Sequence, residues 1–335
     1  RMGASSGPGQ GDPAAIGKAI GIVGGGQLAW MLAESARRHG VPLHVQTPGA
    51  QDPAVALASS IVQAEVRDVA ATAELARRCQ AISFENEWVD LDGLKALEDG
   101  GVCFVPALEA LRPLVCKRSQ RELLQRLNLP SPRWFPLEQA QAPPQDQQAA
   151  DGSVNDPERA SDASDHGAEA AAVGPRLPQG FSYPVMAKAA SGGYDGRGTA
   201  VLHDDSELEA LLERVTPADW IVEEFVSFEQ ELAVVAARDS QGEVRLFPLA
   251  QTHQHGQVCD WVLAPLEASQ ALEQAVRNIA ASLLTSLQYV GVLAIEFFYG
   301  PRGLLINELA PRTHNSGPYT IEACNLSQFD QQLRV

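Results

Sequence analysis

The stretch Ala19-Ile20-Gly21-Ile22-Val23-Gly24-Gly25-Gly26-Gln27-Leu28-Ala29 decides the fold of the first part of the chain. Its first five residues suit a short buried strand, and the glycine turn after them fits the pattern G-x-G-x-x-A. Apolar residues then recur at helical spacing from Leu28 to Ala36, until Gly40. The stretch is therefore predicted to be a β-turn-α unit, in which backbone N–H groups at the start of the helix can hold a phosphate.

Further strands and helices alternate after this unit. Alternating β and α elements indicate an α/β domain with a doubly wound, parallel sheet, which we expect to span residues 19–112 as a Rossmann-like domain. Residues 1–18 are rich in Gly, Ala, Ser and Pro, and we expect them to form a flexible tail. The predicted elements are strands over residues 42–46, 60–64 and 81–84 and a helix over residues 72–79.

The second part of the chain has a different organisation. A helix is predicted over residues 111–127, and residues 138–178 then contain no aromatic residue and no isoleucine. Because this stretch is rich in polar and small residues, it is predicted to be a disordered, low-complexity insertion. After it we expect an α+β domain built from hairpins and two helices. Strands are predicted over residues 183–187, 199–202, 220–226, 231–237, 243–250, 292–299 and 304–308, and helices over residues 206–214 and 272–287.

The composition restricts the possible partners. Of 335 residues, 45% are hydrophobic and 20% are charged, which is typical of globular domains. The 42 acidic and 25 basic residues give a formal net charge of −17, which argues against broad binding to nucleic acid or anionic lipid. The five cysteines form no C-x-x-C pair, and no apolar run is long enough to cross a membrane. We therefore expect small-molecule ligands, no nucleic-acid or membrane partner, and a cytoplasmic location.

A second glycine cluster, Ser191-Gly192-Gly193-Tyr194-Asp195-Gly196-Arg197-Gly198, lies between two predicted strands. Its glycines allow the backbone to approach a ligand closely. Lys188 precedes the cluster by three residues, where an ammonium group could reach phosphate oxygens. The cluster is predicted to be a flap over the phosphates of a nucleotide, and an ordinary mobile hairpin loop is the alternative.

Glu296 and the pair Asn307-Glu308 lie on two predicted strands, which Gly300-Pro301-Arg302-Gly303 joins. The proline suits the second position of a type I turn, and the last glycine suits the left-handed position that closes a three-residue loop. In this register Glu296 stands opposite Glu308. Two opposed carboxylates repel unless a cation lies between them, so the pair is predicted to bind Mg²⁺. Solvent-exposed acids in a shifted register are the alternative.

Two polar loops complete the candidate residues. Ala310-Pro311-Arg312-Thr313-His314-Asn315-Ser316-Gly317 is rich in groups that bind anions and polar ligands. Ser83-Phe84-Glu85-Asn86-Glu87 ends a parallel strand, where open α/β sheets place ligands, although these acids could equally cap the next helix. The first glycine turn alone would suit a nicotinamide cofactor, but Gln46 stands where such folds have an acid. A phosphate of another ligand and a purely structural turn both remain as alternatives.

Taken together, these motifs resemble the ATP-grasp enzymes. The resemblance rests on Lys188, the glycine flap, the strand end Glu223-Glu224-Phe225-Val226, Glu231, Glu296 and Asn307-Glu308. With the first glycine turn and the loop after Glu308 included, the chain resembles the 5-(carboxyamino)imidazole ribonucleotide synthases of purine biosynthesis from about residue 19 to residue 335. The resemblance implies an ATP-grasp region over residues 113–335, interrupted by the insertion.

The resemblance also implies a reaction and a set of site residues. Enzymes of this family use Mg-ATP and bicarbonate to make carboxyphosphate, which carboxylates the exocyclic amine of aminoimidazole ribonucleotide and releases ADP and phosphate. Members are commonly homodimers. Catalysis there is mainly positioning and charge neutralisation.

The resemblance implies three sets of site residues. The implied ATP-binding residues are Lys117, Lys188, Gly193, Tyr194, Asp195, Gly196, Arg197, Gly198, Thr199, Glu223, Glu224, Phe225, Val226, Glu231, Gln254, Asn307 and Glu308. The implied metal ligands are Glu296 and Glu308, and the implied catalytic residues are Arg312, Lys188 and Asn307. The implied ribonucleotide-binding residues are Gly26, Gln27, Leu28, Glu85, Glu87, Tyr194, Arg197, His314 and Asn315.

The chain departs from the family pattern at several positions. Gln254 stands where many members have His, and Thr313 and Pro318 stand where Pro and His are usual. The family also carries a small C-terminal domain, which we expect to be missing here. Three other functions stay open: another ATP-grasp carboxylase or ligase, a non-catalytic nucleotide-binding module, and a nicotinamide oxidoreductase. The intact acidic pair and Lys188 argue against the second, and Gln46 argues against the third.

Overall fold

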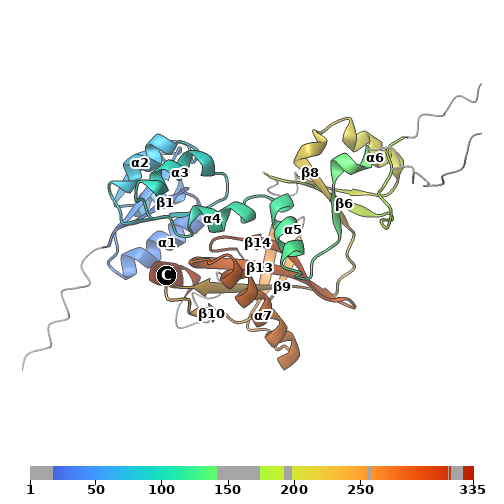
Figure 1. The fold of residues 1–335 in the computed structure, drawn as a ribbon. Coiled ribbons are helices and arrows are strands. Elements are labelled where there is room, and N and C mark those ends of the chain that lie inside the picture. The colour runs from blue at the N-terminus through green and yellow to red at the C-terminus, as the bar shows by residue number, and fades with distance from the viewer. Residues whose placement is uncertain (1–17, 142–173, 192–197, 256–257, 316, 318–326) are drawn as a thin grey trace, which may run out of the picture. The chain divides into compact units, whose positions relative to one another are not determined.

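The computed structural model describes residues 18–141, 174–191, 198–255, 258–315, 317 and 327–335 (Figure 1). The chain divides into two compact units. The larger unit consists of Arg1–Ser131 and Ser227–Val335, and the smaller unit consists of Pro132–Val226. Residues 113–131 thus belong to the same unit as the N-terminal sheet.

The N-terminal part of the larger unit is a four-stranded parallel sheet in the order β3-β2-β1-β4. The predicted doubly wound α/β architecture is confirmed. Its elements are β1 (Ile20–Val23), α1 (Gln27–Arg38), β2 (Leu43–Thr47), a 3₁₀ helix (Pro53–Leu57), β3 (Ser60–Gln63), α2 (Val69–Ala76), β4 (Ala81–Phe84) and α3 (Leu91–Asp99).

Neighbouring residues of β1 pack into two different cores. Ile22 lies in a buried cluster with Leu32 of α1. The next residue, Val23, lies in a second cluster with Leu75 of α2 and Leu94 of α3. Because successive side chains of a strand point to opposite faces, α1 covers one face of the sheet and α2 and α3 cover the other.

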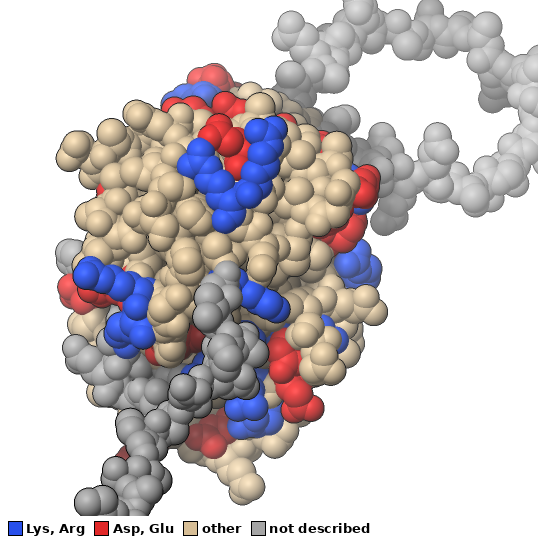
Figure 2. All heavy atoms as spheres, turned by 90° about the vertical axis from the view of Figure 1, so that its left-hand side faces the viewer, with Lys and Arg blue, Asp and Glu red and all other residues tan. Residues whose placement is uncertain are grey.

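Figure 2 shows the face of the larger unit that the N-terminal elements form. Basic and acidic side chains lie there in small mixed groups between uncharged residues, rather than in a continuous basic patch. Among the described residues, no helix has the length and the apolar character that a membrane crossing requires.

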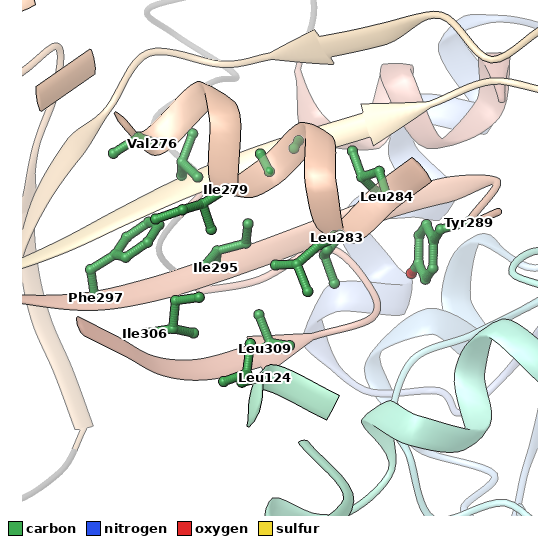
Figure 3. Packing of buried hydrophobic residues seen from close by; sticks show 14 of the residues in the cluster. Leu124, Val276, Ile279, Leu283, Leu284, Tyr289, Ile295, Phe297, Ile306 and Leu309 are labelled. Carbon is green, nitrogen blue, oxygen red and sulfur yellow. The ribbon is translucent and has the colours of Figure 1, made fainter. Parts of the chain in front are cut away.

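The C-terminal part of the larger unit is a six-stranded antiparallel sheet in the order β12-β11-β9-β13-β14, with β10 paired to β9. Helix α7 covers one face, where its Ile279 and Leu283 point toward Ile295 and Phe297 of β13 (Figure 3). Burying each such side chain contributes about 1.5–3 kcal/mol. The elements are β9 (Gln230–Arg238), β10 (Val244–Leu246), β11 (Ala250–His255), β12 (Val258–Leu263), α7 (Gln270–Ser286), β13 (Gly291–Gly300), β14 (Gly303–Ala310) and α9 (Gln328–Arg334).

The single helix predicted over residues 111–127 is wrong. The structure has α4 (Leu108–Leu111), a 3₁₀ helix (Arg112–Leu114) and α5 (Lys117–Arg126) instead. Pro113 has no N–H to donate inside a helix. Cys116 is extended and caps α5, because its sulfur accepts a hydrogen bond from the Ser119 N–H at 3.4 Å. This break makes Lys117 the first residue of α5.

The strand predicted over residues 243–250 is divided as well. β10 ends at Leu246 and β11 begins at Ala250, and both pair with β9. Pro248 lies between them and cannot donate to the ladder, which interrupts the pairing. β12 forms a hairpin with β11 and was not predicted from the sequence.

The smaller unit is a four-stranded antiparallel sheet in the order β5-β8-β6-β7. Leu208 and Leu211 of α6 pack with buried residues of this sheet. The predicted insertion starts later than residue 138, because Leu137–Ala140 is an ordered 3₁₀ helix with a buried Ala140. Residues 142–173 of the insertion lie outside the described residues. The elements are β5 (Trp134–Pro136), β6 (Val185–Ala189), β7 (Thr199–Leu202), α6 (Asp205–Leu212), a 3₁₀ helix (Pro217–Asp219) and β8 (Trp220–Glu224).

Candidate active site

Three carboxylates lie on one face of the six-stranded sheet. Glu296 of β13 pairs with Glu308 of β14, as predicted. Glu231 of β9 pairs with Phe298, which is two residues from Glu296, so it points to the same side. Phe297, between them, packs into the core beneath α7. The three acids therefore occupy the face of the sheet opposite α7.

The opposed pair reaches its register by a route that differs from the prediction. The loop has two residues rather than three, because the two turn glycines pair with each other. A β-bulge next to Glu296 then shifts the register, so that Glu296 pairs with Glu308 while Phe297 pairs with Ile306. Asn307 is the additional residue on β14. Without the bulge Asn307 would stand opposite Glu296, and Glu308 would face the core.

The pKa of the Glu296 carboxyl group is strongly perturbed. Its burial raises the pKa of Glu296 to about 8, and the neighbouring Glu308 and Glu231 add to the rise. Arg312 and Lys117 lower the pKa but do not offset these effects. The raised pKa disfavours the charged form of Glu296 in the ligand-free protein, and a cation at this position would favour the charged form.

Two basic residues border the carboxylates. Lys117 Nζ lies 3.8 Å from Glu308 Oε1. Arg312 Nε donates to Glu87 Oε1 at 2.9 Å, and both side chains are largely buried. Burial raises the pKa of Glu87, and the positive charge of Arg312 opposes that rise. Because Glu87 follows β4 and Arg312 follows β14, this ion pair joins the polar ends of the two sheets of the larger unit.

His314 lies beside the same acids. Its Nε2 is 3.9 Å from Glu296 Oε1. Burial, and then the charge of Arg312, lower the pKa of His314 to about 4, so the imidazole is neutral at pH 7. Gln328 of α9 holds the His314 backbone, because its Oε1 accepts from the His314 N–H at 3.0 Å and its Nε2 donates to the His314 carbonyl at 2.9 Å. Asn315, the next residue, is exposed.

The first glycine turn is held from inside the domain by Glu85. Its Oε1 accepts from the Gly26 N–H at 2.9 Å, and its Oε2 accepts from the Ala29 N–H at 2.7 Å. A Cβ atom on Gly24, whose φ is +109°, would lie 2.7 Å from the Cβ of Glu85. The Glu85 carboxylate thus accepts hydrogen bonds from N–H groups at the start of α1 that would otherwise be available to a phosphate. This arrangement favours a structural turn over a phosphate loop, and it puts Glu85 beside Gln27 and Leu28 at the start of α1.

Gln46 explains why β2 ends without an acid. The residue is fully buried, and its Oε1 accepts from Thr72 Oγ1 at 2.7 Å. Its Nε2 donates to the carbonyl of Glu65 at 2.8 Å. The side chain therefore ties β2 to α2 and to the turn before it, and it does not face a nucleotide ribose. The nicotinamide alternative loses its remaining support.

In the smaller unit, two of the predicted ATP-binding residues form an ion pair with each other. Lys188 Nζ lies 2.6 Å from Glu223 Oε2, and both side chains are largely buried. Glu224 accepts from the Arg133 N–H at 2.8 Å and from Arg133 Nε at 3.0 Å. Phe225 is exposed at the end of β8, and Val226 follows it. Gly198 and Thr199 are described, whereas Gly193, Tyr194, Asp195, Gly196 and Arg197 lie outside the described residues.

Gln254 lies at a second irregularity of the sheet. The register between β11 and β12 shifts between His253 and Gln254. The Gln254 backbone donates a hydrogen bond to the Glu231 carboxylate, which opposes the pKa rise that burial causes there. Gln254 therefore contacts a predicted ribose-binding acid through its backbone, while His253 stacks on Trp261.

Sequence reasoning missed the residues that hold this site from behind. Gln328 forms hydrogen bonds with the His314 backbone, and Gln120 and Arg121 of α5 form hydrogen bonds with the backbone of β14. These contacts join positions far apart in the chain, so no local pattern marks them. The only local signal is that Gln120 and Arg121 are polar residues next to the leucines on the buried side of a helix.

Comparisons with known proteins agree with this geometry. A family model described as an ATP-grasp domain matches residues 167–329, and one described as a ribonucleotide synthetase preATP-grasp domain matches residues 17–113. The N5-carboxyaminoimidazole ribonucleotide synthase of Synechococcus elongatus is 46% identical over 316 residues, which are 94% of this chain and 72% of that protein. The enzyme of the same name from Bacillus subtilis is 31% identical and matches 95% of this chain and 76% of its own length.

This chain belongs to the N5-carboxyaminoimidazole ribonucleotide synthase family. The family expected from the sequence motifs is thereby confirmed. An ADP complex of such a synthetase is similar in structure, with a TM-score of 0.78, 30% identity, and coverage of 95% of this chain and 76% of that one. The Aspergillus clavatus synthase, in complex with ADP and 5-aminoimidazole ribonucleotide, gives a TM-score of 0.76 at 26% identity over 96% of this chain and 76% of that one.

Proposed function

We propose that this ATP-grasp ligase carboxylates 5-aminoimidazole ribonucleotide with bicarbonate at the expense of ATP. A bicarbonate oxygen attacks the γ-phosphorus, the bond from that phosphorus to the β,γ-bridging oxygen breaks, and ADP leaves. The exocyclic amine then attacks the carbon of carboxyphosphate, the carbon–oxygen bond to phosphate breaks, and the amine loses a proton. The observation that carries the proposal is the opposed pair Glu296 and Glu308, with Lys117, Arg312 and His314 around it.

The donor set fits Mg²⁺, which we propose as the metal of this site. The two carboxylates and the Asn307 amide offer hard oxygen ligands, and a cation would relieve the repulsion that raises the pKa of Glu296. In the described parts of the chain, no group of three or more His, Cys, Asp or Glu side chains could hold a metal ion alone. Bound Mg²⁺ would neutralise and orient the phosphates of ATP. Few protein ligands are expected for such an ion, because nucleotide phosphates and water supply the others.

The residues around the acids have separate roles in this proposal. Arg312, fixed by Glu87, would orient the bicarbonate or the transferring phosphoryl group with its guanidinium. His314 is neutral at pH 7 and would hydrogen-bond the ribonucleotide, with Asn315 beside it. Glu231 would hold the ribose hydroxyls of ATP, and Lys117 and Lys188 would contact its phosphates. Gly26, Gln27, Leu28, Glu85 and Glu87 would contribute to the ribonucleotide-binding wall.

Phosphate release from Mg-ATP tests the reaction. The assay contains bicarbonate and is run with and without 5-aminoimidazole ribonucleotide, and a bicarbonate-depleted sample is the control. We expect release that needs both bicarbonate and the ribonucleotide. ATP turnover that the ribonucleotide does not stimulate would instead favour another ATP-grasp carboxylase or ligase, and nucleotide binding without any turnover would favour a non-catalytic module.

Two further properties are part of the proposal. The enzyme is a homodimer, which light scattering on the purified protein would test. Its location is the cytoplasm, which fractionation of the source cells would test.

A further inference from the structure

β14, which carries Asn307 and Glu308, is an edge strand of the six-stranded sheet. In the part of the chain that the structure describes, only β13 pairs with it as a strand, so the backbone groups of its other edge need different partners. The partner of the Ile306 N–H lies outside the sheet, because this group donates to the Pro130 carbonyl at 2.8 Å. The remaining edge groups at the acidic end contact α5.

Two consecutive residues of α5, Gln120 and Arg121, take the place of a neighbouring strand. Gln120 donates to the Leu309 carbonyl at 2.8 Å and accepts from the Leu309 N–H at 3.0 Å, as a strand residue would. Arg121 donates from Nη1 to the Ile306 carbonyl at 3.0 Å and from Nη2 to the Asn307 carbonyl at 2.6 Å. Both side chains are buried, with residue exposures of 6% and 3%. We refer to Gln120 and Arg121 as the α5 clamp.

The two contacts of Arg121 match the β-bulge. In a regular strand the carbonyls of successive residues point to opposite edges of the strand. Ile306 and Asn307 are successive residues, yet both of their carbonyls reach the same guanidinium group. The bulge on β14 makes this possible, because it interrupts the alternation at Asn307. A guanidinium offers donors on two nitrogens in a fixed planar fork, whereas the donors of a lysine ammonium share one nitrogen and have no fixed orientation.

We propose that the α5 clamp positions Asn307 and Glu308 for metal binding by fixing the bulge of β14. The bulge decides whether Glu308 or Asn307 stands opposite Glu296, and Arg121 bonds to the two peptides that form it. Gln120 fixes the next two peptides, on either side of Leu309. Arg121 is thus a positioning residue that acts through the backbone of a metal-binding strand. This inference rests on the magnesium site of the proposed function.

The test measures metal affinity apart from turnover. Binding of Mn²⁺ in the presence of ADP is followed by electron paramagnetic resonance in the wild type, Arg121→Met and Arg121→Lys. We expect Arg121→Met to weaken Mn²⁺ binding by about 10- to 100-fold, the range found for residues that orient metal ligands from behind. Arg121→Lys keeps the charge but loses the fork, and we expect an intermediate loss. The Mg²⁺ concentration that half-saturates ATP turnover should rise in parallel.

A matched control separates positioning from general destabilisation. Leu283 of α7 is fully buried in the core on the other face of the sheet, so Leu283→Ala should lower the melting temperature without changing Mn²⁺ affinity. Wild-type Mn²⁺ affinity in a folded Arg121→Met would overturn the inference. If that variant does not fold, wild-type affinity in Arg121→Lys would overturn it. A wild-type protein that binds no Mn²⁺ with ADP would instead contradict the proposed metal site itself.

Discussion

At the scale of single residues, the candidate site contains charges that oppose each other unless a ligand is bound. Glu296 is buried, faces Glu308 across two strands, and has a pKa of about 8 for these reasons. Glu308 is closer to solvent and lies near Lys117. The repulsion destabilises the ligand-free protein and favours binding of a divalent cation. This relation leads to a prediction about Glu308.

Glu308→Gln should weaken metal binding and leave the fold intact. Since residues that only orient metal ligands contribute ~10- to 100-fold, loss of a ligand should cost at least about 100-fold in metal affinity. The melting temperature should stay the same or rise, because Glu296 loses a like charge. The measurement is Mg²⁺ titration of ATP turnover together with a thermal melt. Glu243→Gln, an exposed acid before β10, is the control. Unchanged Mg²⁺ dependence in Glu308→Gln would remove Glu308 from the metal site.

Lys188→Met should destabilise the smaller unit as well as weaken ATP binding. Lys188 and Glu223 form a buried ion pair, and removing one partner leaves the other charge uncompensated. Such a loss costs about 3–5 kcal/mol. Adding Glu223→Gln should restore most of the stability in urea unfolding, but calorimetry should still show weak ATP binding. If the double variant bound ATP like the wild type, Lys188 would not be a phosphate ligand.

At the scale of elements, α9 illustrates how one helix joins distant parts of the larger unit. Phe329 packs into the core cluster that contains α1, and Gln328 holds the His314 backbone. Asp330 accepts a hydrogen bond from Ser35 Oγ of α1, and its carboxylate lies 3.0 Å from Nε2 of His39, the residue that ends α1. Burial alone would raise the pKa of Asp330, but hydrogen bonds from Ser35, Ser327 and His39 outweigh it and lower the pKa below its ordinary value of 3.8.

The depressed pKa predicts a pH-dependent contribution of Asp330 to stability. A group with a lowered pKa in the folded protein stabilises it above the unfolded-state pKa and loses this effect as the pH falls through the folded-state value. Asp330→Asn should therefore cost about 2 kcal/mol at pH 7 and progressively less below pH 3.8. Urea unfolding of both proteins at pH 7 and pH 3 checks this. An equal difference at both pH values would show that the carboxylate charge does not contribute.

Elements also show where sequence reasoning succeeds and where it stops. β1, β4 and β7 follow from local patterns, because alternation and turn residues mark a strand within a few positions. The break before α5 is marked locally by Pro113 and by the cap at Cys116, whereas the bulge at Asn307 is held by contacts with distant residues. Neither was predicted from the sequence. The register of Glu296 and Glu308 came out right although the assumed loop was one residue too long, because the bulge supplies the same offset. The residue types of the site were therefore predictable, whereas the groups that hold them were not.

At the scale of the whole molecule, the described residues that flank residues 142–173 lie next to each other. The Arg176 N–H donates to the Ala140 carbonyl at 3.1 Å. Few residues are therefore needed to connect residue 141 to residue 174. Residues 142–173 contain no aromatic residue, so they have little apolar surface with which to stabilise a core.

Replacing residues 142–173 with a four-residue Gly-Ser turn should leave stability and turnover nearly unchanged. Loop-closure entropy changes slowly with length, by about 0.6 kcal/mol for each doubling, and a shorter loop costs less. We expect a melting temperature equal to or slightly above that of the wild type, and unchanged ribonucleotide-stimulated phosphate release. As a control, a variant that also lacks residues 137–140 should lose stability, because it removes the buried Leu137 and Ala140 from the core of the smaller unit. If the shorter deletion alone abolished turnover while the melting temperature was kept, the insertion would have a functional role that its composition does not reveal.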